Sequence, residues 1–155
     1  MSILLNMLVY FASLTGGNLP SCNEGGYAKT VTGTTIIAPG QSAILSSGFF
    51  LCDMSGRDFV LNAQVNVHSG GEDFEIFSSA SVVLPSCSFG ASYGTASQRL
   101  QNASGWQSSG NSALFSPTIS GNCSGQNWVH YLTVTNYGSS DLVLSGRKYV
   151  FLELL

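Results

Sequence analysis

Hydrophobic and polar residues alternate with a period of two along most of this chain. In residues 59–67 every second position is apolar, starting at Phe59, and the positions between them are mostly polar. This pattern is typical of a β-strand that buries one face. The alternation resumes over residues 74–84, after the turn signal Ser69-Gly70-Gly71, so we predict that these two strands form a hairpin.

The same pattern predicts strands on both sides of this pair. Residues 30–37 are rich in β-branched side chains, residues 43–52 are apolar, and Pro39-Gly40 forms a turn between them. Further strands are expected at residues 128–134, 142–144 and 149–155. Seven or eight short strands, without a helical pattern longer than two turns, predict an all-β fold of the antiparallel β-sandwich, jelly-roll-like type.

The chain is short enough for a single domain, which we place at residues 1–155. It opens with an apolar segment at residues 1–14, but no Lys or Arg precedes Lys29, so the segment lacks the basic start of a signal peptide. It is too short to span a membrane, and Asn6 interrupts it. We expect residues 1–20 to contribute a buried strand or short helix under the sandwich, or an arm that packs into a neighbouring subunit.

Residues 86–112 show little periodicity and are predicted to form the longest loop, a place where function often lies. The alternative is an elaborated loop with one or two short strands around residues 89–93, held by Cys87. Aromatic rings beside amides can stack a sugar ring and bond its hydroxyls. The candidate binding residues in this range are Tyr93, Asn102, Trp106 and Gln107. Trp106 could instead fill the open end of the sandwich.

Charge is scarce in this chain. Charged residues make up 8% of it, against about 25% in an average protein, and the net charge is -3. With no cationic cluster beyond Arg147-Lys148, the sequence excludes nucleic acid as a partner. A nearly uncharged exterior favours contact with copies of the same chain, so a homo-oligomer is expected.

The four cysteines are Cys22, Cys52, Cys87 and Cys123. Their spacings contain no C-x-x-C pair and no neighbouring pair of histidines, so they do not indicate a zinc site. We predict two disulfides, with three pairings open, or four buried thiols in a reducing compartment. The segments 102–104 and 122–124 match the N-glycosylation pattern, which has meaning in a secreted chain.

No catalytic motif surrounds the serines, histidines or carboxylates, so we expect no enzyme and no cofactor or metal. His68 and His130 are interpreted as packing or interface residues. The acidic cluster of Glu72, Asp73 and Glu75 is interpreted as a solvated turn, with a weak calcium site as the alternative.

The chain has an early Pro39-Gly40 turn, Gly70-Gly71 at mid-chain and an apolar last strand at residues 147–155. This layout resembles the jelly-roll heads of viral and phage fibres and decoration proteins, and the tumour-necrosis-factor-like trimeric heads. The resemblance covers residues 30–155 and implies a trimer that attaches to a capsid or a receptor.

These observations support three hypotheses about function. The first is a structural or surface-display protein of a virus particle or extracellular filament, whose partners are copies of itself and other coat or filament proteins. The second is a carbohydrate- or receptor-binding head that uses Tyr93 and Trp106. A hydrolase is the third, and it has no motif in its favour.

Overall fold

The computed structural model describes residues 19–52, 58–84, 88–89, 93–110, 112–115, 119–120 and 126–155, and every regular element in these ranges is a β-strand. The strands are β1 (Gly26–Val31), β2 (Thr35–Ile37), β3 (Ser42–Cys52), β4 (Phe59–Ser69), β5 (Asp73–Leu84), β6 (Ser88–Phe89), β7 (Tyr93–Gln101), β8 (Gly105–Ser108), β9 (Ser112–Phe115), β10 (Ile119–Ser120), β11 (Gln126–Asn136), β12 (Leu142–Leu144) and β13 (Lys148–Leu154). The all-β prediction is confirmed. None of the described residues forms a helix long and apolar enough to cross a membrane.

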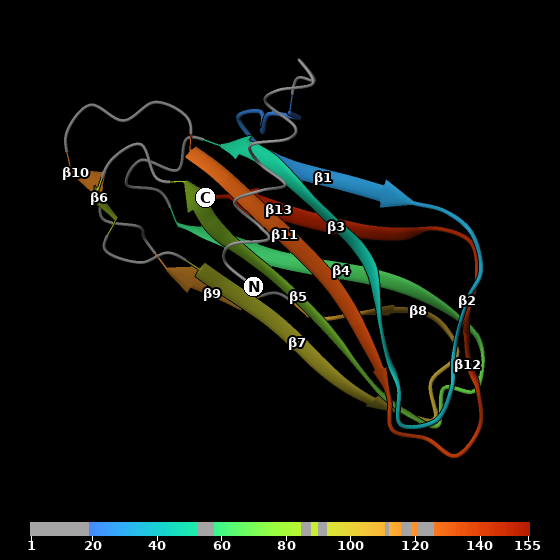
Figure 1. Cartoon of the computed structure of the whole chain (residues 1–155). Helices are drawn as coiled ribbons and strands as arrows, with labels where there is room; N and C mark the ends of the chain where they lie inside the picture. Colours follow the sequence, from blue (N-terminus) through green and yellow to red (C-terminus); the bar gives the residue numbers. More distant parts are fainter. Residues whose placement is uncertain are drawn as a thin grey trace.

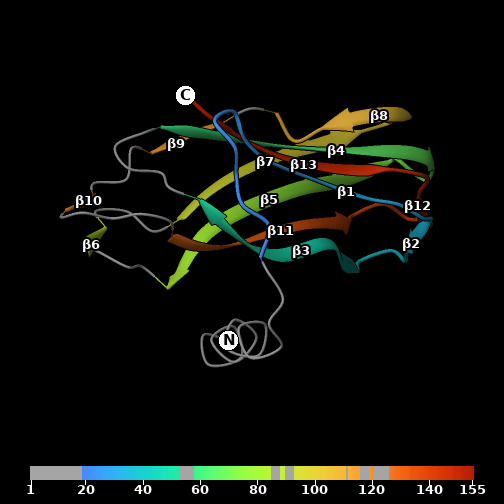
Figure 2. The same ribbon diagram turned by 90° about the horizontal axis from the view of Figure 1, so that it is seen from above.

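The strands form two antiparallel sheets that lie face to face as a curled, jelly-roll-like sandwich (Figures 1 and 2). The seven-stranded sheet has the order β1-β13-β4-β12-β2, and β8 and β9 also pair with β4. The four-stranded sheet has the order β3-β11-β5-β7. The short pair β6 and β10 lies apart at one end (Figure 1).

The core fills the space between the two sheets. Along β4 the alternation predicted from the sequence holds, because Phe59, Leu61, Ala63, Val65 and Val67 are all buried. The opposing sheet contributes large side chains such as Trp128, whose ring meets that of Phe59 edge to face at 5.8 Å. Burying each large apolar side chain stabilises the fold by about 1.5–3 kcal/mol.

The predicted hairpin of β4 and β5 is wrong, although both strands exist. β4 belongs to the seven-stranded sheet and β5 to the four-stranded sheet, so the turn between them crosses from one layer to the other. Each strand buries its apolar face against the opposite sheet, and alternation alone cannot distinguish this arrangement from a paired hairpin. The turn between the two layers requires glycine at position 70, because its φ is 76° and a Cβ there would lie 1.8 Å from the carbonyl oxygen of Asp141.

The long loop predicted at residues 86–112 is also wrong as a continuous loop. β7 and β8 lie in this range, and β7 pairs with β5 along its whole length, from Tyr93 opposite Ser81 to Gln101 opposite Asp73. Small residues occupy inward positions of β7, including buried Ala96, so the strand carries a weak hydrophobic signal. Backbone pairing with β5 compensates for the modest side-chain burial.

A disulfide joins Cys22 to Cys52, and so connects the segment before β1 to the end of β3. It resolves one pairing among those the sequence left open. Cys87 and Cys123 lie outside the described residues, as do the apolar residues 1–14 and the segment 122–124, so the second disulfide stays a prediction.

Candidate functional site

The outer face of the seven-stranded sheet carries three aromatic side chains in a row. They are Trp106 of β8 and Tyr149 and Phe151 of β13, which we call the aromatic strip. The ring centroids of Trp106 and Tyr149 lie 5.5 Å apart, and those of Tyr149 and Phe151 lie 5.6 Å apart with an interplanar angle of 21°. Trp106 is 52% exposed, so this large apolar ring faces solvent.

The pleat of β13 places these rings on the outside. Val150 and Leu152 are buried in the core, so the residues that alternate with them, Tyr149, Phe151 and Glu153, point to the other face. β13 thus stabilises the core with one face and contributes two of the three rings of the strip with the other.

Side-chain amides of β4 lie between the aromatic residues of its two neighbours. Gln64 pairs with Tyr149 of β13 on one side, and Asn66 pairs with Trp106 of β8 on the other. Asn62 pairs with Phe151 and accepts a hydrogen bond from Ser108 Oγ at 2.5 Å through its Oδ1. The strip therefore combines flat apolar rings with hydrogen-bonding amides.

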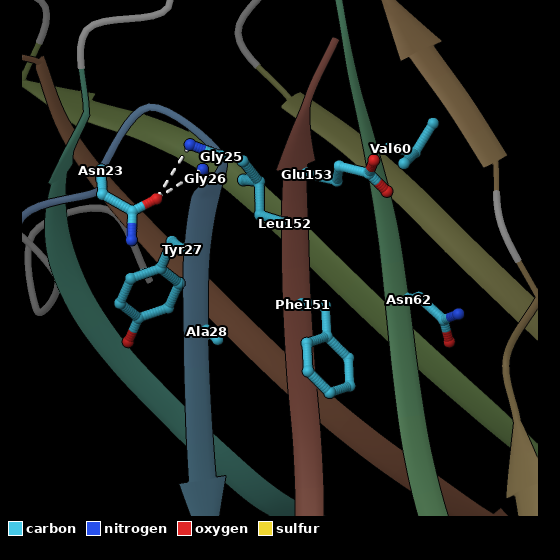
Figure 3. A pocket seen from close by; sticks show the side chains of 10 residues that line it. All are labelled: Asn23, Gly25, Gly26, Tyr27, Ala28, Val60, Asn62, Phe151, Leu152 and Glu153. Carbon is cyan, nitrogen blue, oxygen red and sulfur yellow. Dashed lines mark hydrogen bonds between the residues drawn. The ribbon is translucent and has the colours of Figure 1, made fainter.

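The strip continues into a hollow of about 480 Å³ beside Phe151. Figure 3 shows this hollow with the side chains of Phe151 and Glu153 from β13 and of Val60 and Asn62 from β4 around it. The first residues of β1 complete its wall, because Gly26 pairs with Glu153 and Ala28 pairs with Phe151. Their side chains are minimal, so space remains next to the larger residues of β13.

The structure does not bring together the four binding residues predicted from the sequence. Trp106 lies on the strip, whereas Tyr93 begins β7 at the edge of the four-stranded sheet. Asn102 is exposed in the turn after β7, with a φ of 50°. Gln107 follows Trp106 on β8 and so points to the opposite face, where its Nε2 donates to the carbonyl oxygen of Ser104 at 2.9 Å.

Sequence reasoning missed Tyr149, Phe151 and Glu153. A signal was present in residues 149–154, where aromatic and acidic residues alternate with aliphatic ones. Aromatic side chains on the phase opposite to a buried aliphatic face indicate an exposed aromatic surface.

His130 packs in the core, as predicted. It is 1% exposed, its Nε2 lies 3.0 Å from Ser46 Oγ, and its ring tilts against those of Tyr27 and Phe50. Burial, reinforced by the positive charge of Lys29, lowers the pKa of His130 to about 4.

The acidic cluster at the start of β5 is held by the protein's own side chains. Glu72 accepts hydrogen bonds from Ser139 and Ser140, with Ser140 the stronger cause of its lowered pKa. Asp73 forms a two-pronged ion pair with Arg99, at 2.5 and 2.9 Å, and the hydrogen bond from Arg99 lowers its pKa. Among the described residues, no group of three or more His, Cys, Asp or Glu side chains is placed to hold a metal ion.

No protein-family model matches the sequence, and no curated protein matches it. One similar solved structure is the Yersinia pseudotuberculosis-derived mitogen, at a TM-score of 0.30 and 11% identity over 82% of this chain and 85% of that chain. Another is TmCBM61 in complex with β-1,4-galactotriose, at a TM-score of 0.41 and 8% identity over 83% of this chain and 81% of that chain. A third is the VP2 subviral particle of infectious bursal disease virus, at a TM-score of 0.34 and 9% identity over 83% of this chain and 42% of that chain.

These similarities are weak, and they assign neither a family nor a function to the chain. The expected resemblance to jelly-roll heads holds only as a faint likeness.

Proposed function

We propose that this chain is a non-catalytic β-sandwich that binds carbohydrate through the aromatic strip. The observation that carries the proposal is the row of Trp106, Tyr149 and Phe151 on the outer face of one sheet, with ring centroids 5.5 and 5.6 Å apart. This is the second of the hypotheses drawn from the sequence, with Tyr149 and Phe151 in the place given to Tyr93.

The chemistry of the strip suits a sugar chain. The C–H faces of a pyranose ring stack on flat aromatic rings, while its hydroxyl groups need donors and acceptors at the rim. Asn62, Gln64 and Asn66 supply amides beside the rings. The strip lies on paired strands whose other face is the core, so its geometry is set before a ligand arrives and little ordering is required on binding.

A glycan array followed by titration with the strongest ligand tests the proposal. We expect Trp106→Ala to weaken binding at least tenfold, equivalent to about 1.4 kcal/mol, because the most exposed ring of the strip is removed. Tyr137→Ala is the matched control, since Tyr137 is an exposed aromatic residue outside the strip. Absence of glycan binding, or equal losses in both variants, would contradict the proposal.

Intrinsic fluorescence gives a second readout of the same site. The chain has two tryptophans, and Trp128 is buried in the core while Trp106 faces solvent. A fluorescence change on glycan binding should therefore persist in Trp128→Phe and disappear in Trp106→Ala. The opposite pattern would place the ligand away from the strip.

A second candidate function is a structural subunit of a virus particle or extracellular filament. The observation that favours it is the exposure of Ile36 on β2 and Ile44 on β3, at 64% and 63%. Both strands lie at sheet edges, and exposed apolar edges invite contact with another subunit. The Cys22–Cys52 disulfide supports an oxidising, extracellular setting for either function. A subunit that displays a glycan-binding face would combine both.

A further inference from the structure

The hollow beside Phe151 differs from the rest of the strip because it contains a charged side chain, Glu153. The role that we infer for it rests on the proposed carbohydrate binding. Its volume of about 480 Å³ falls within the range of about 300–1,000 Å³ that is typical of small-ligand sites. It adjoins a ring of the strip, so a sugar chain stacked on Tyr149 and Phe151 reaches it directly.

The hollow depends on the backbone at the start of β1. Gly26 has a φ of 129°, and a Cβ at this position would lie 1.8 Å from the carbonyl oxygen of Leu152. The Asn23 side chain fixes this turn, because its Oδ1 accepts hydrogen bonds from the backbone N–H groups of Gly25 and Gly26 at 2.9 and 3.1 Å. The space thus arises at two glycines, Gly25 and Gly26, in a turn that the Asn23 side chain holds.

One charged side chain, Glu153, lines the hollow among the described residues around it. Its carboxylate is exposed and offers hydrogen-bond acceptors only. Asn62 of the neighbouring strand also lines the hollow, and its Oδ1 accepts a hydrogen bond from Ser108 Oγ. The carboxylate of Glu153 therefore supplies the charged acceptor to which the hydroxyl groups of a sugar can donate.

We propose that this hollow is a specificity subsite that accepts one uncharged sugar unit, and that Glu153 excludes acidic sugars. Two adjacent hydroxyl groups of a neutral sugar donate to the two carboxylate oxygens of Glu153, forming strong charge-assisted hydrogen bonds. A carboxylate or sulfate in the same position meets a like charge with no cation among the lining residues to compensate. Glu153 therefore selects by repulsion as well as by attraction.

The test compares the wild type with Glu153→Gln on an array that carries neutral oligosaccharides beside their sulfated, sialylated and uronic-acid counterparts. We expect the wild type to prefer the neutral member of each pair by at least about tenfold. In Glu153→Gln this preference should shrink about tenfold, mainly through tighter binding of the acidic members. Glu75→Gln on the four-stranded sheet, the same chemical change away from the hollow, should keep the wild-type preference.

The outcomes separate this inference from the proposed function. If the wild type binds neutral and acidic glycans equally, or if Glu153→Gln leaves the preference unchanged, the subsite is refuted while carbohydrate binding stands. If no glycan binds, the proposed function fails and the subsite fails with it. Because Glu153 is exposed, the variant should fold normally, and an unchanged melting temperature verifies this.

Discussion

His130 shows what burial does to a single ionisable side chain in this fold. The pKa of His130 is about 4 in the folded chain, whereas the pKa of a histidine in an unfolded chain is about 6.5. Between these two pH values the unfolded chain binds a proton that the folded chain does not. The free energy of unfolding should therefore fall as the pH is lowered from about 6.5 to about 4, by about 3 kcal/mol in total.

The variant His130→Gln isolates this effect because glutamine does not titrate. Chemical denaturation at several pH values should show a shallower loss of stability in the variant across this window, whatever its stability at neutral pH. His68→Gln is the matched control, because it removes the exposed histidine at the end of β4 and leaves the buried His130 in place. If the free energy of unfolding depends on pH equally in His130→Gln and in the wild type, His130 does not cause the loss of stability.

At the scale of the elements, the Cys22–Cys52 disulfide ties the segment before β1 to the end of β3. The bond joins residues 30 apart in sequence. Closing a loop of that size lowers the conformational entropy of the unfolded chain, which stabilises the fold by about 3–4 kcal/mol. Replacing both cysteines with alanine should lower the free energy of unfolding by about that amount, measured by denaturant titration.

A reductant provides the control for this experiment. In reducing conditions the wild type and the double variant should have nearly equal stability, since both then lack the bond. A difference below about 1 kcal/mol in oxidising conditions would mean that the bond adds little to the stability of the fold.

How far the sequence predicts the elements depends on the strength of their alternation. β4, β12 and β13 follow from their alternating apolar residues, which are buried in the structure. β7 does not, because its inward residues are as small as Ala96 and its position depends on hydrogen bonds to β5. Pairing partners are set by the whole fold, which explains why the strands β4 and β5 were predicted correctly and their hairpin was not.

The same limit applies to the candidate site. Trp106 could be selected from the sequence because an aromatic residue among amides and serines is unusual there. Its contact with Tyr149 could not, because it depends on β4 lying between β8 and β13. Local composition thus identifies one member of the strip, and only the strand order brings the others to it.

At the scale of the whole molecule, Ile36 and Ile44 bear on assembly. If the sheet edges of β2 and β3 form a subunit contact, the wild type should sediment as a defined oligomer, and the double variant Ile36→Ser with Ile44→Ser should sediment as a monomer. Trp106→Ala should keep the oligomer, since it lies on another surface. A wild type that stays monomeric at high micromolar concentration would rule out this role for the edges.

β13 lies between β1 and β4, with Gly26 of β1 opposite Glu153 near the far end of the described sequence. During synthesis, β1 therefore cannot pair with β13 until almost all of this sequence has left the ribosome. Such long-range pairing is slow to form. The aromatic rings of β13 take their places at the same moment. If the aromatic strip binds carbohydrate as we propose, retention on an immobilised sugar would count only chains in which β13 has paired with β1 and β4, and would therefore report the native fraction.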